Sequence, residues 1–154
     1  MRIDIQRIMV PTDFSENAEH AYAYAEVLAK RFGAKLLLTH VGEIPIYPAG
    51  PGQIPIGWEN LAVDLQDQTR ENMKTALTKF QPDVEVETLM SEGTPFLEIV
   101  RMARDHDVDM IVMSTHGHTG IKNLLLGSTA EKVVRKAACP VLTVHPGERT
   151  FVLP

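Results

Sequence analysis

One stretch of the sequence combines glycines, hydroxyl side chains and histidines in a pattern that suits an anion. It runs from Ser114 to Ser128, after an apolar run that ends at Met113 and before a segment with helical spacing. In an α/β protein such a loop leads from a buried strand to a helix N-terminus, where backbone N–H groups and the helix dipole favour negative charge. We therefore predict a phosphate-binding loop. A glycine-rich loop with only a structural role is the alternative.

Two residues at the end of this loop strengthen the phosphate prediction. Gly127 has no side chain, which lets the backbone approach a ligand closely. Ser128 is predicted to cap the next helix, with Glu131 completing a capping box three residues later. His116 is the nearest candidate for a general base, but a histidine in such a loop more often bonds locally or contacts a phosphate, so we assign no catalytic residue.

The elements that must position this loop are predicted from apolar runs and helical spacing. Strands are expected at residues 8–10, 35–41, 84–89, 110–113 and 141–144, and helices at 16–32, 59–80, 95–106 and 128–138. Alternation of this kind is typical of a parallel sheet with helices on both faces. The third strand alternates apolar and polar residues and is placed at an edge, whereas the first, second and fourth are apolar throughout. The expected fold is Rossmann-like α/β, with five parallel strands in the order 3-2-1-4-5.

This strand order places the topological switch point between the first and fourth strands, where ligands of open α/β sheets bind. The segments that lead there are Pro11-Thr12-Asp13 and the loop from Ser114 to Ser128. Topology and loop chemistry thus select the same place for a phosphorylated ligand. Asp13 is predicted to contact this ligand, and orienting the turn into the first helix is its alternative role.

Composition and charge limit the class of protein. The 154 residues suit one domain, expected at 1–146, with a Pro/Gly-rich loop at 42–57 and a tail at 147–154. The net charge of −5 argues against nucleic-acid binding through a broad basic surface. The single cysteine, Cys139, excludes an intrachain disulfide and fits a reduced, cytoplasmic setting. We expect no signal peptide and no membrane span, because no apolar run approaches the ~20 residues that a span needs.

The last predicted strand has no protection against pairing with another chain. Residues 141–144 are apolar apart from one threonine and include no charged side chain. Because an unprotected edge strand invites pairing, we predict a two-fold homodimer through Val141 to Val144. An edge covered by the C-terminal tail is the alternative.

Three segments resemble the universal stress protein family. The run IMVPTDFS at residues 8–15 resembles the opening of these proteins, and CPVLTV at 139–144 resembles their last strand. Residues 114–128 resemble their nucleotide-loop pattern G-x2-G-x9-G-S, except that Ser114 stands at the first glycine. The likeness covers nearly the whole chain outside the proline-rich loop and the tail. It implies an ATP-binding fold of the adenine nucleotide alpha hydrolase type, usually homodimeric and tied to stress survival.

The resemblance also implies which residues contact each part of ATP. Asp13 would bind the ribose, and Pro11 and Thr12 would line the pocket. Val41 would contact adenine through its backbone, and Met113 would lie near the base. The phosphates, with any Mg²⁺ that arrives with them, would be held by Gly117, Gly127, Ser128 and Thr129.

The sequence leaves three functions open, and Ser114 favours the last of them because a side chain at this position restricts the backbone angles. The first hypothesis is an ATP-binding module with little or no turnover. The second is a weak ATPase or self-phosphorylating protein that uses Ser128 or Thr129. The third is an interaction protein that binds no nucleotide. We predict no dedicated metal site, because His40, His116 and His118 lack the spacing of a zinc motif.

Overall fold

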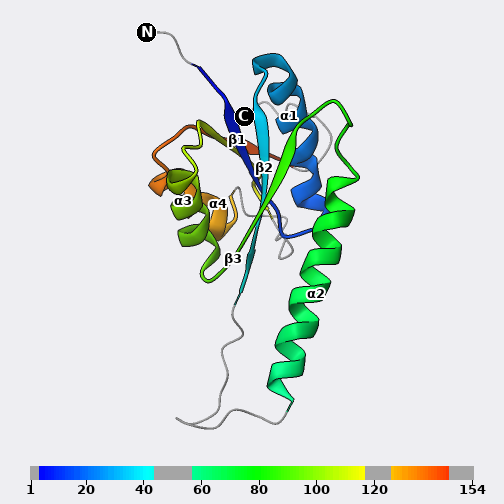
Figure 1. Ribbon diagram of the computed structural model, residues 1–154. Coiled ribbons are helices and arrows are strands. Elements are labelled where there is room, and N and C mark those ends of the chain that lie inside the picture. The colour runs from blue at the N-terminus through cyan, green and yellow to red at the C-terminus, as the bar shows by residue number, and fades with distance from the viewer. Residues whose placement is uncertain (1–3, 44–56, 117–125, 146–154) are drawn as a thin grey trace.

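The computed structural model describes residues 4–43, 57–116 and 126–145, and within them the chain forms one sheet with helices on both faces (Figure 1). The described strands are β1 (Arg7–Pro11), β2 (Lys35–Gly42), β3 (Val86–Glu92), β4 (Met110–Ser114) and β5 (Val141–Val144). The described helices are α1 (Glu16–Phe32), α2 (Trp58–Leu77), α3 (Pro95–Asp105) and α4 (Ser128–Lys136). The predicted 42–57 loop lies mostly outside these residues, and the predicted tail at 147–154 lies entirely outside them.

The strand order is β3-β2-β1-β4-β5, and every neighbouring pair is parallel. This confirms the predicted topology. β1 is central: Ile8 pairs with Leu36 on one side and with Met110 on the other. Helices α1 and α2 lie on one face of the sheet, and α3 and α4 lie on the other (Figure 1). The chain adds β2 and β3 on one side of β1, and then β4 and β5 on the other side. The loops that follow β1 and β4 therefore border the same crevice.

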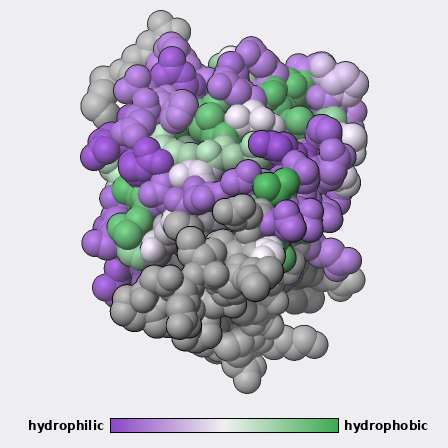
Figure 2. Space-filling model, turned by 60° about the horizontal axis from the view of Figure 1, so that its bottom comes forward, coloured by the Kyte–Doolittle hydropathy of each residue, from purple (hydrophilic) through white to green (hydrophobic). Residues whose placement is uncertain are grey.

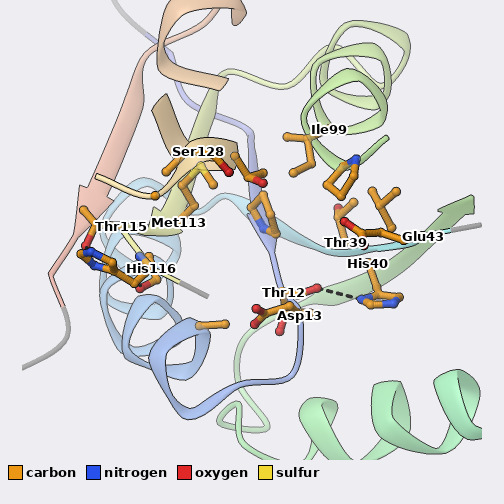
Figure 3. Close-up of a pocket in the computed structure, with 18 residues that line it drawn as sticks. Thr12, Asp13, Thr39, His40, Glu43, Ile99, Met113, Thr115, His116 and Ser128 are labelled. Carbon is orange, nitrogen blue, oxygen red and sulfur yellow. Dashed lines mark hydrogen bonds between the residues drawn. The ribbon is translucent and has the colours of Figure 1, made fainter. Parts of the chain in front are cut away.

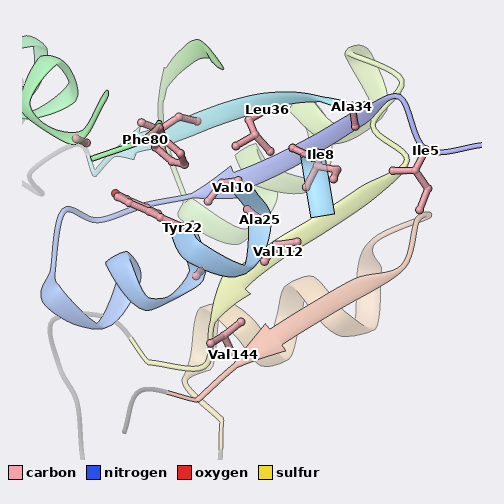
Figure 4. Packing of buried hydrophobic residues seen from close by; sticks show 14 of the residues in the cluster. Ile5, Ile8, Val10, Tyr22, Ala25, Ala34, Leu36, Phe80, Val112 and Val144 are labelled. Carbon is pink, nitrogen blue, oxygen red and sulfur yellow. The ribbon is translucent and has the colours of Figure 1, made fainter. Parts of the chain in front are cut away.

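The strands are apolar on both faces because each face is covered by helices. Ile8 and Val10 belong to the cluster beneath α1, with Leu36 and Val112 from the neighbouring strands (Figure 4). Met9, which lies between them in sequence, belongs to the cluster beneath α3 and α4. Full burial of each such side chain stabilises the fold by about 1.5–3 kcal/mol. The carboxyl ends of β1, β2 and β4 are therefore anchored on both sides.

Helix α1 begins and ends where the sequence predicts. Ser15 accepts a hydrogen bond from the Ala18 N–H at 3.2 Å and so caps the N-terminus. Gly33 follows the last turn with φ 68°, the left-handed conformation that glycine adopts without strain. The inner face of α1 consists mostly of alanines, which allow the helix to lie close to β1 and β4.

Three predicted elements have a boundary at least two residues from the observed one. Helix α4 ends at Lys136 instead of residue 138, and packing explains the other two. Helix α2 ends at Leu77 instead of residue 80, and Phe80 leaves the helical path to stack on Tyr22 with ring centroids 4.9 Å apart. Strand β3 starts at Val86 instead of residue 84 and continues to Glu92, because it pairs along the whole of β2 from Leu36 to Gly42. Its half-exposed residues confirm the predicted edge position.

The surface is mixed in character. Figure 2 looks toward the carboxyl end of the sheet and shows separate hydrophobic patches between polar residues on the part that is coloured. None of the described helices has the length and apolar content to cross a bilayer.

Candidate functional site

A cavity of about 510 Å³ opens at the carboxyl ends of β1, β2 and β4, beside the N-termini of α3 and α4 (Figure 3). Cavities of ~300–1,000 Å³ are typical of small-molecule sites. The structure places eight of the nine predicted site residues around it: Pro11, Thr12, Asp13, Val41, Met113, Gly127, Ser128 and Thr129. The ninth, Gly117, lies outside the described residues.

The position of Asp13 suits both roles considered from the sequence, which are contact with a ligand and orientation of the turn into the first helix. It lines the cavity. Its Oδ1 also accepts hydrogen bonds from the Ser15 N–H at 3.1 Å and the Ser15 hydroxyl at 2.5 Å. Because Ser15 caps α1, this carboxylate is tied to the start of the helix, where the dipole favours its negative charge. Asp13 therefore presents a pre-positioned acceptor on one side of the cavity.

The turn that carries Asp13 is held from several directions. The Thr12 hydroxyl accepts a hydrogen bond from the Phe14 N–H at 3.0 Å and shares one of 2.6 Å with the Tyr22 hydroxyl. Burial raises the pKa of Tyr22 to about 12. Phe14 has φ 63°, a left-handed conformation that costs a non-glycine residue about 1–3 kcal/mol and that persists only when surrounding contacts impose it.

The predicted cap of α4 is wrong. The N-cap residue is Gly127, and Ser128 is the first residue of the helix, so no Ser128–Glu131 capping box forms. The Gly127 N–H donates to the Thr115 carbonyl at 2.7 Å. A Cβ on Gly127 would lie 2.8 Å from that same oxygen. Glycine is needed here because the protein's own backbone lies so close. The N–H groups that follow Gly127, in the first turn of α4, have no acceptors within the helix.

Ser114 does not require the backbone freedom of glycine. It is the last residue of β4 and pairs with Val144, so its backbone is extended. Its side chain is buried at the cavity wall, where Oγ accepts a weak hydrogen bond from the His116 N–H at 3.4 Å. The serine therefore contributes a hydroxyl to the cavity without distorting the strand.

One wall of the cavity is apolar and comes from three elements. Val41 lies at the end of β2, Met113 near the end of β4, and Ile99 in the first turns of α3, with Pro95 beside it. Such a wall suits the faces of a flat aromatic ring, and the backbone of Val41 lies at its border. The sequence prediction named Val41 and Met113 but missed the contribution of α3.

The charges around the cavity come mainly from acids and helix termini. Its ionisable lining residues within the described part of the chain are Asp13, His40, Glu43 and His116, and none is a lysine or arginine. In Figure 3, Asp13 lies across the cavity from Ser128. A ligand with hydroxyl donors at one end and an anion at the other matches this arrangement, because the start of α4 attracts the anion.

The histidines that the structure describes do not gather into a metal site. The described residues contain no group of three or more histidine, cysteine or acidic side chains placed to hold an ion. His40 Nδ1 lies 2.8 Å from the Thr12 carbonyl, and His116 Nδ1 lies 3.0 Å from the Thr115 hydroxyl. His118 lies outside the described residues.

Three further polar residues of the cavity wall were not predicted from the sequence. Thr39, Thr115 and Glu43 border the cavity. The signal that could have found two of them is position: Glu43 and Thr115 lie just beyond the carboxyl ends of β2 and β4, and such ends meet at one edge of a parallel sheet. Thr39 lies within β2, and its place follows from the pairing of β1 with β2, in which it is opposite Pro11 at the end of β1.

The fold and the cavity together define an α/β protein with a ligand site at the switch point of its sheet. Comparison with known proteins identifies the class. A model described as the universal stress protein family matches residues 4–145. The chain therefore belongs to the universal stress protein family.

Individual relatives agree with this assignment. Universal stress protein MJ0531 of Methanocaldococcus jannaschii is 35% identical over 140 residues, which are 90% of this chain and 81% of the relative. A solved structure of MJ0577, a universal stress protein of the same organism, is 31% identical with a TM-score of 0.77, and the match covers 93% of this chain and 97% of MJ0577. A crystal structure of a universal stress protein in complex with cAMP is 24% identical, has a TM-score of 0.62 and shares the fold over 94% of this chain and 99% of that one.

Proposed function

We propose that this chain is an adenine-nucleotide-binding module of the universal stress response, with ATP as its ligand and little or no turnover. Three kinds of surface in one cavity carry this proposal. Apolar side chains, the Asp13 carboxylate held by Ser15 and the start of α4 all border it. The base, the ribose and the phosphates of a nucleotide present surfaces that match these three.

Each part of the nucleotide has a natural position in this cavity. The base lies between Ile99 and Met113 and contacts the backbone of Val41. The ribose hydroxyls donate to Asp13. The phosphates lie at the first turn of α4, where the N–H groups of Ser128 and Thr129 face an anion and any Mg²⁺ is carried in by the phosphates themselves.

The absence of a lining lysine or arginine among the described residues favours binding over phosphoryl transfer. Enzymes that transfer phosphoryl groups place cations or metal ions where charge develops in the transition state. Here the described residues offer backbone N–H groups and two acids instead. Ser128 and Thr129 remain the candidates for slow self-phosphorylation, and incorporation of labelled phosphate would reveal it.

The first experiment is to denature the purified protein and identify any released nucleotide by mass spectrometry. Added ATP is then titrated by calorimetry. We expect bound adenine nucleotide or binding of added ATP, and the protein of the same fold that was crystallised with cAMP makes cAMP the second ligand to titrate. A preparation that releases no nucleotide and binds no ATP at millimolar concentration would refute the proposal.

A matched pair of variants locates the site. Asp13→Asn keeps an acceptor for Ser15 but removes the charge that faces the ribose, and hydrogen bonds to charged groups contribute about 1.5–3 kcal/mol. We expect the Kd for ATP to rise on the order of tenfold or more. Asp64→Asn changes an exposed aspartate on α2, outside the cavity, and serves as the control. Equal affinities of the two variants would place the nucleotide elsewhere.

We also propose that the molecule acts as a homodimer through β5. This strand pairs only with β4 among the described strands, which leaves its other edge open to a second copy.

A further inference from the structure

We propose that His40 is a positioning residue for nucleotide recognition: its ring holds the turn between β1 and α1, so that Asp13 faces the cavity and discriminates ribose from deoxyribose. This inference rests on the proposed function. It concerns a contact between two segments that are far apart in the sequence, and neither the nucleotide-loop motif nor the opening motif includes it.

The ring of His40 contacts the residues on both sides of Asp13. Its Nδ1 lies 2.8 Å from the Thr12 carbonyl oxygen. Because a carbonyl oxygen only accepts, Nδ1 carries the hydrogen and donates it. The ring also stacks on Phe14, with centroids 4.4 Å apart and an angle of 30° between the planes. Figure 3 shows His40 beside Thr12 and Asp13, with the hydrogen bond as a dashed line.

These two contacts act where the backbone most needs support. Phe14 has φ 63°, and the described residues include only one other non-glycine residue with positive φ, Asp107. A turn with a left-handed phenylalanine relaxes unless its neighbours impose that conformation. The Thr12 hydroxyl holds the Phe14 N–H from within the turn. From outside the turn, the Thr12 N–H donates to the Thr39 carbonyl at 2.8 Å and the Tyr22 hydroxyl bonds the Thr12 hydroxyl. His40 differs from these supports because its ring contacts both the carbonyl before Asp13 and the side chain after it.

The same strand end also carries the backbone that borders the base. His40 and Val41 are consecutive residues of β2, which pairs with β1 on one side and β3 on the other. β2 therefore sets the distance between the base position and the ribose acceptor. Movement of the turn away from β2 would leave the base contact in place and misplace Asp13 together with its neighbour Thr12.

This separation gives the inference a specific signature. Loss of the His40 contacts weakens the binding of ATP but not that of deoxy-ATP, because the deoxynucleotide lacks the hydroxyl that Asp13 binds. A purely structural role would weaken all nucleotides alike. The ratio of the Kd for deoxy-ATP to the Kd for ATP is thus the quantity to measure, with the 2′-deoxy and 3′-deoxy forms tested in turn.

Two variants separate the two contacts of the His40 ring, the hydrogen bond to Thr12 and the stacking on Phe14. His40→Phe keeps the aromatic face for Phe14 and removes the donor to Thr12. His40→Asn keeps a donor near the position of Nδ1 and removes the face, and its small size makes it the variant to use if His40→Phe does not fold. His20→Asn is the matched control, because His20 Nδ1 also donates to a carbonyl, that of Glu16, on the exposed side of α1.

We expect calorimetry to give the unmodified chain a Kd ratio on the order of tenfold, as for a hydrogen bond to a charged group. His40→Phe should bring the ratio to within about twofold of one and change the Kd for deoxy-ATP by less than about threefold. The ratio for His40→Asn should lie between those of the unmodified chain and His40→Phe. The His20 control should keep the full ratio. An unchanged ratio in both His40 variants, or an equal loss of ATP and deoxy-ATP, would overturn this inference alone. Absence of any nucleotide binding by the unmodified chain would overturn the proposed function and this inference with it.

Discussion

At the scale of single residues, Ser114 and Gly127 occupy two positions that are both glycine in the nucleotide-loop pattern, but the physical constraint differs between them. At Ser114 the backbone is extended and paired with β5, so serine meets no conformational barrier there. At Gly127 the limit is space, because the Thr115 carbonyl lies where a Cβ would be. The sequence shows both positions as parts of one pattern and cannot separate these causes, since they depend on which backbone atoms lie nearby.

Ser114→Gly should therefore leave nucleotide affinity nearly unchanged. We expect the Kd for ATP to stay within about threefold, because the strand is already extended and only one hydroxyl is lost from the wall. Stability should fall by about 0.5–1 kcal/mol, because glycine loses more backbone freedom in a strand. Calorimetry and urea unfolding measure the two effects. A gain in ATP affinity of tenfold or more would show that the serine obstructs the phosphates.

Tyr22 should make stability depend on pH in the alkaline range. Burial raises the pKa of its hydroxyl from 10.0 to about 12 in the folded chain. The folded state thus favours the protonated form, and this contribution is complete below pH 10 and is lost as the pH rises toward 12. Its size is on the order of 2 kcal/mol.

Tyr22→Phe should abolish this dependence. At neutral pH the variant should lose about 1 kcal/mol, the usual net value of a hydrogen bond, because the Thr12 hydroxyl loses its partner. Between pH 10 and 12 its free energy of unfolding should decline less steeply than that of the unmodified chain. Urea unfolding across this range measures both, with Tyr24→Phe, a more exposed position, as the control. Parallel pH profiles for the unmodified chain and Tyr22→Phe would contradict the role of Tyr22.

At the scale of elements, the order and type of each helix and strand could be predicted, whereas several ends could not. Apolar periodicity and the caps Ser15 and Gly33 located α1 correctly, because these signals act within one turn of the chain. The end of α2 depends on Phe80 packing against Tyr22, and the extent of β3 depends on the length of β2. Both depend on residues distant in sequence. The site follows the same division: the segments after β1 and β4 were predicted to border it, and the α3 wall, the His40 contact and several polar lining residues were not.

The start of α4 gives a prediction at this scale. In Gly127→Ala the new Cβ would meet the Thr115 carbonyl at 2.8 Å, so the backbone must shift. We expect a loss of about 1–3 kcal/mol, as for overpacking elsewhere, and weaker ATP binding because the N–H groups of Ser128 and Thr129 move with the helix. Thermal unfolding and calorimetry measure these effects. Gly42→Ala is the control, since its Cβ would meet only ordinary contacts at 3.7 Å and beyond.

A Gly127→Ala variant as stable as Gly42→Ala would show that the loop before α4 adjusts freely. In that case the glycine would be explained by approach to a ligand, as the sequence alone indicated. The two substitutions add the same methyl group at the carboxyl edge of the sheet, so their difference isolates the effect of the nearby carbonyl.

At the scale of the whole molecule, the backbone hydrogen bonds show which residues of the two edge strands, β5 and β3, direct their N–H and C=O groups away from the sheet. Ile111 donates to the Pro140 carbonyl and Thr115 donates to the Val144 carbonyl. Because alternate residues of a strand face the same neighbour, Val141 and Thr143 direct their backbone groups away from β4. On the other edge, Leu36 donates to the Glu85 carbonyl, so Thr88 of β3 faces outward in the same way.

A dimer through β5 should therefore respond to proline at one edge and not at the other. Thr143→Pro removes an outward N–H from β5 without touching the bonds to β4, and proline is tolerated at such edge positions. Thr88→Pro makes the same change on β3, and both threonines are half-buried. Sedimentation equilibrium should give twice the 17.1 kDa chain mass for the unmodified protein and Thr88→Pro, and a single chain for Thr143→Pro. Dissociation of Thr88→Pro alone would place the interface on β3. A monomeric unmodified chain would instead favour an edge covered by the C-terminal tail.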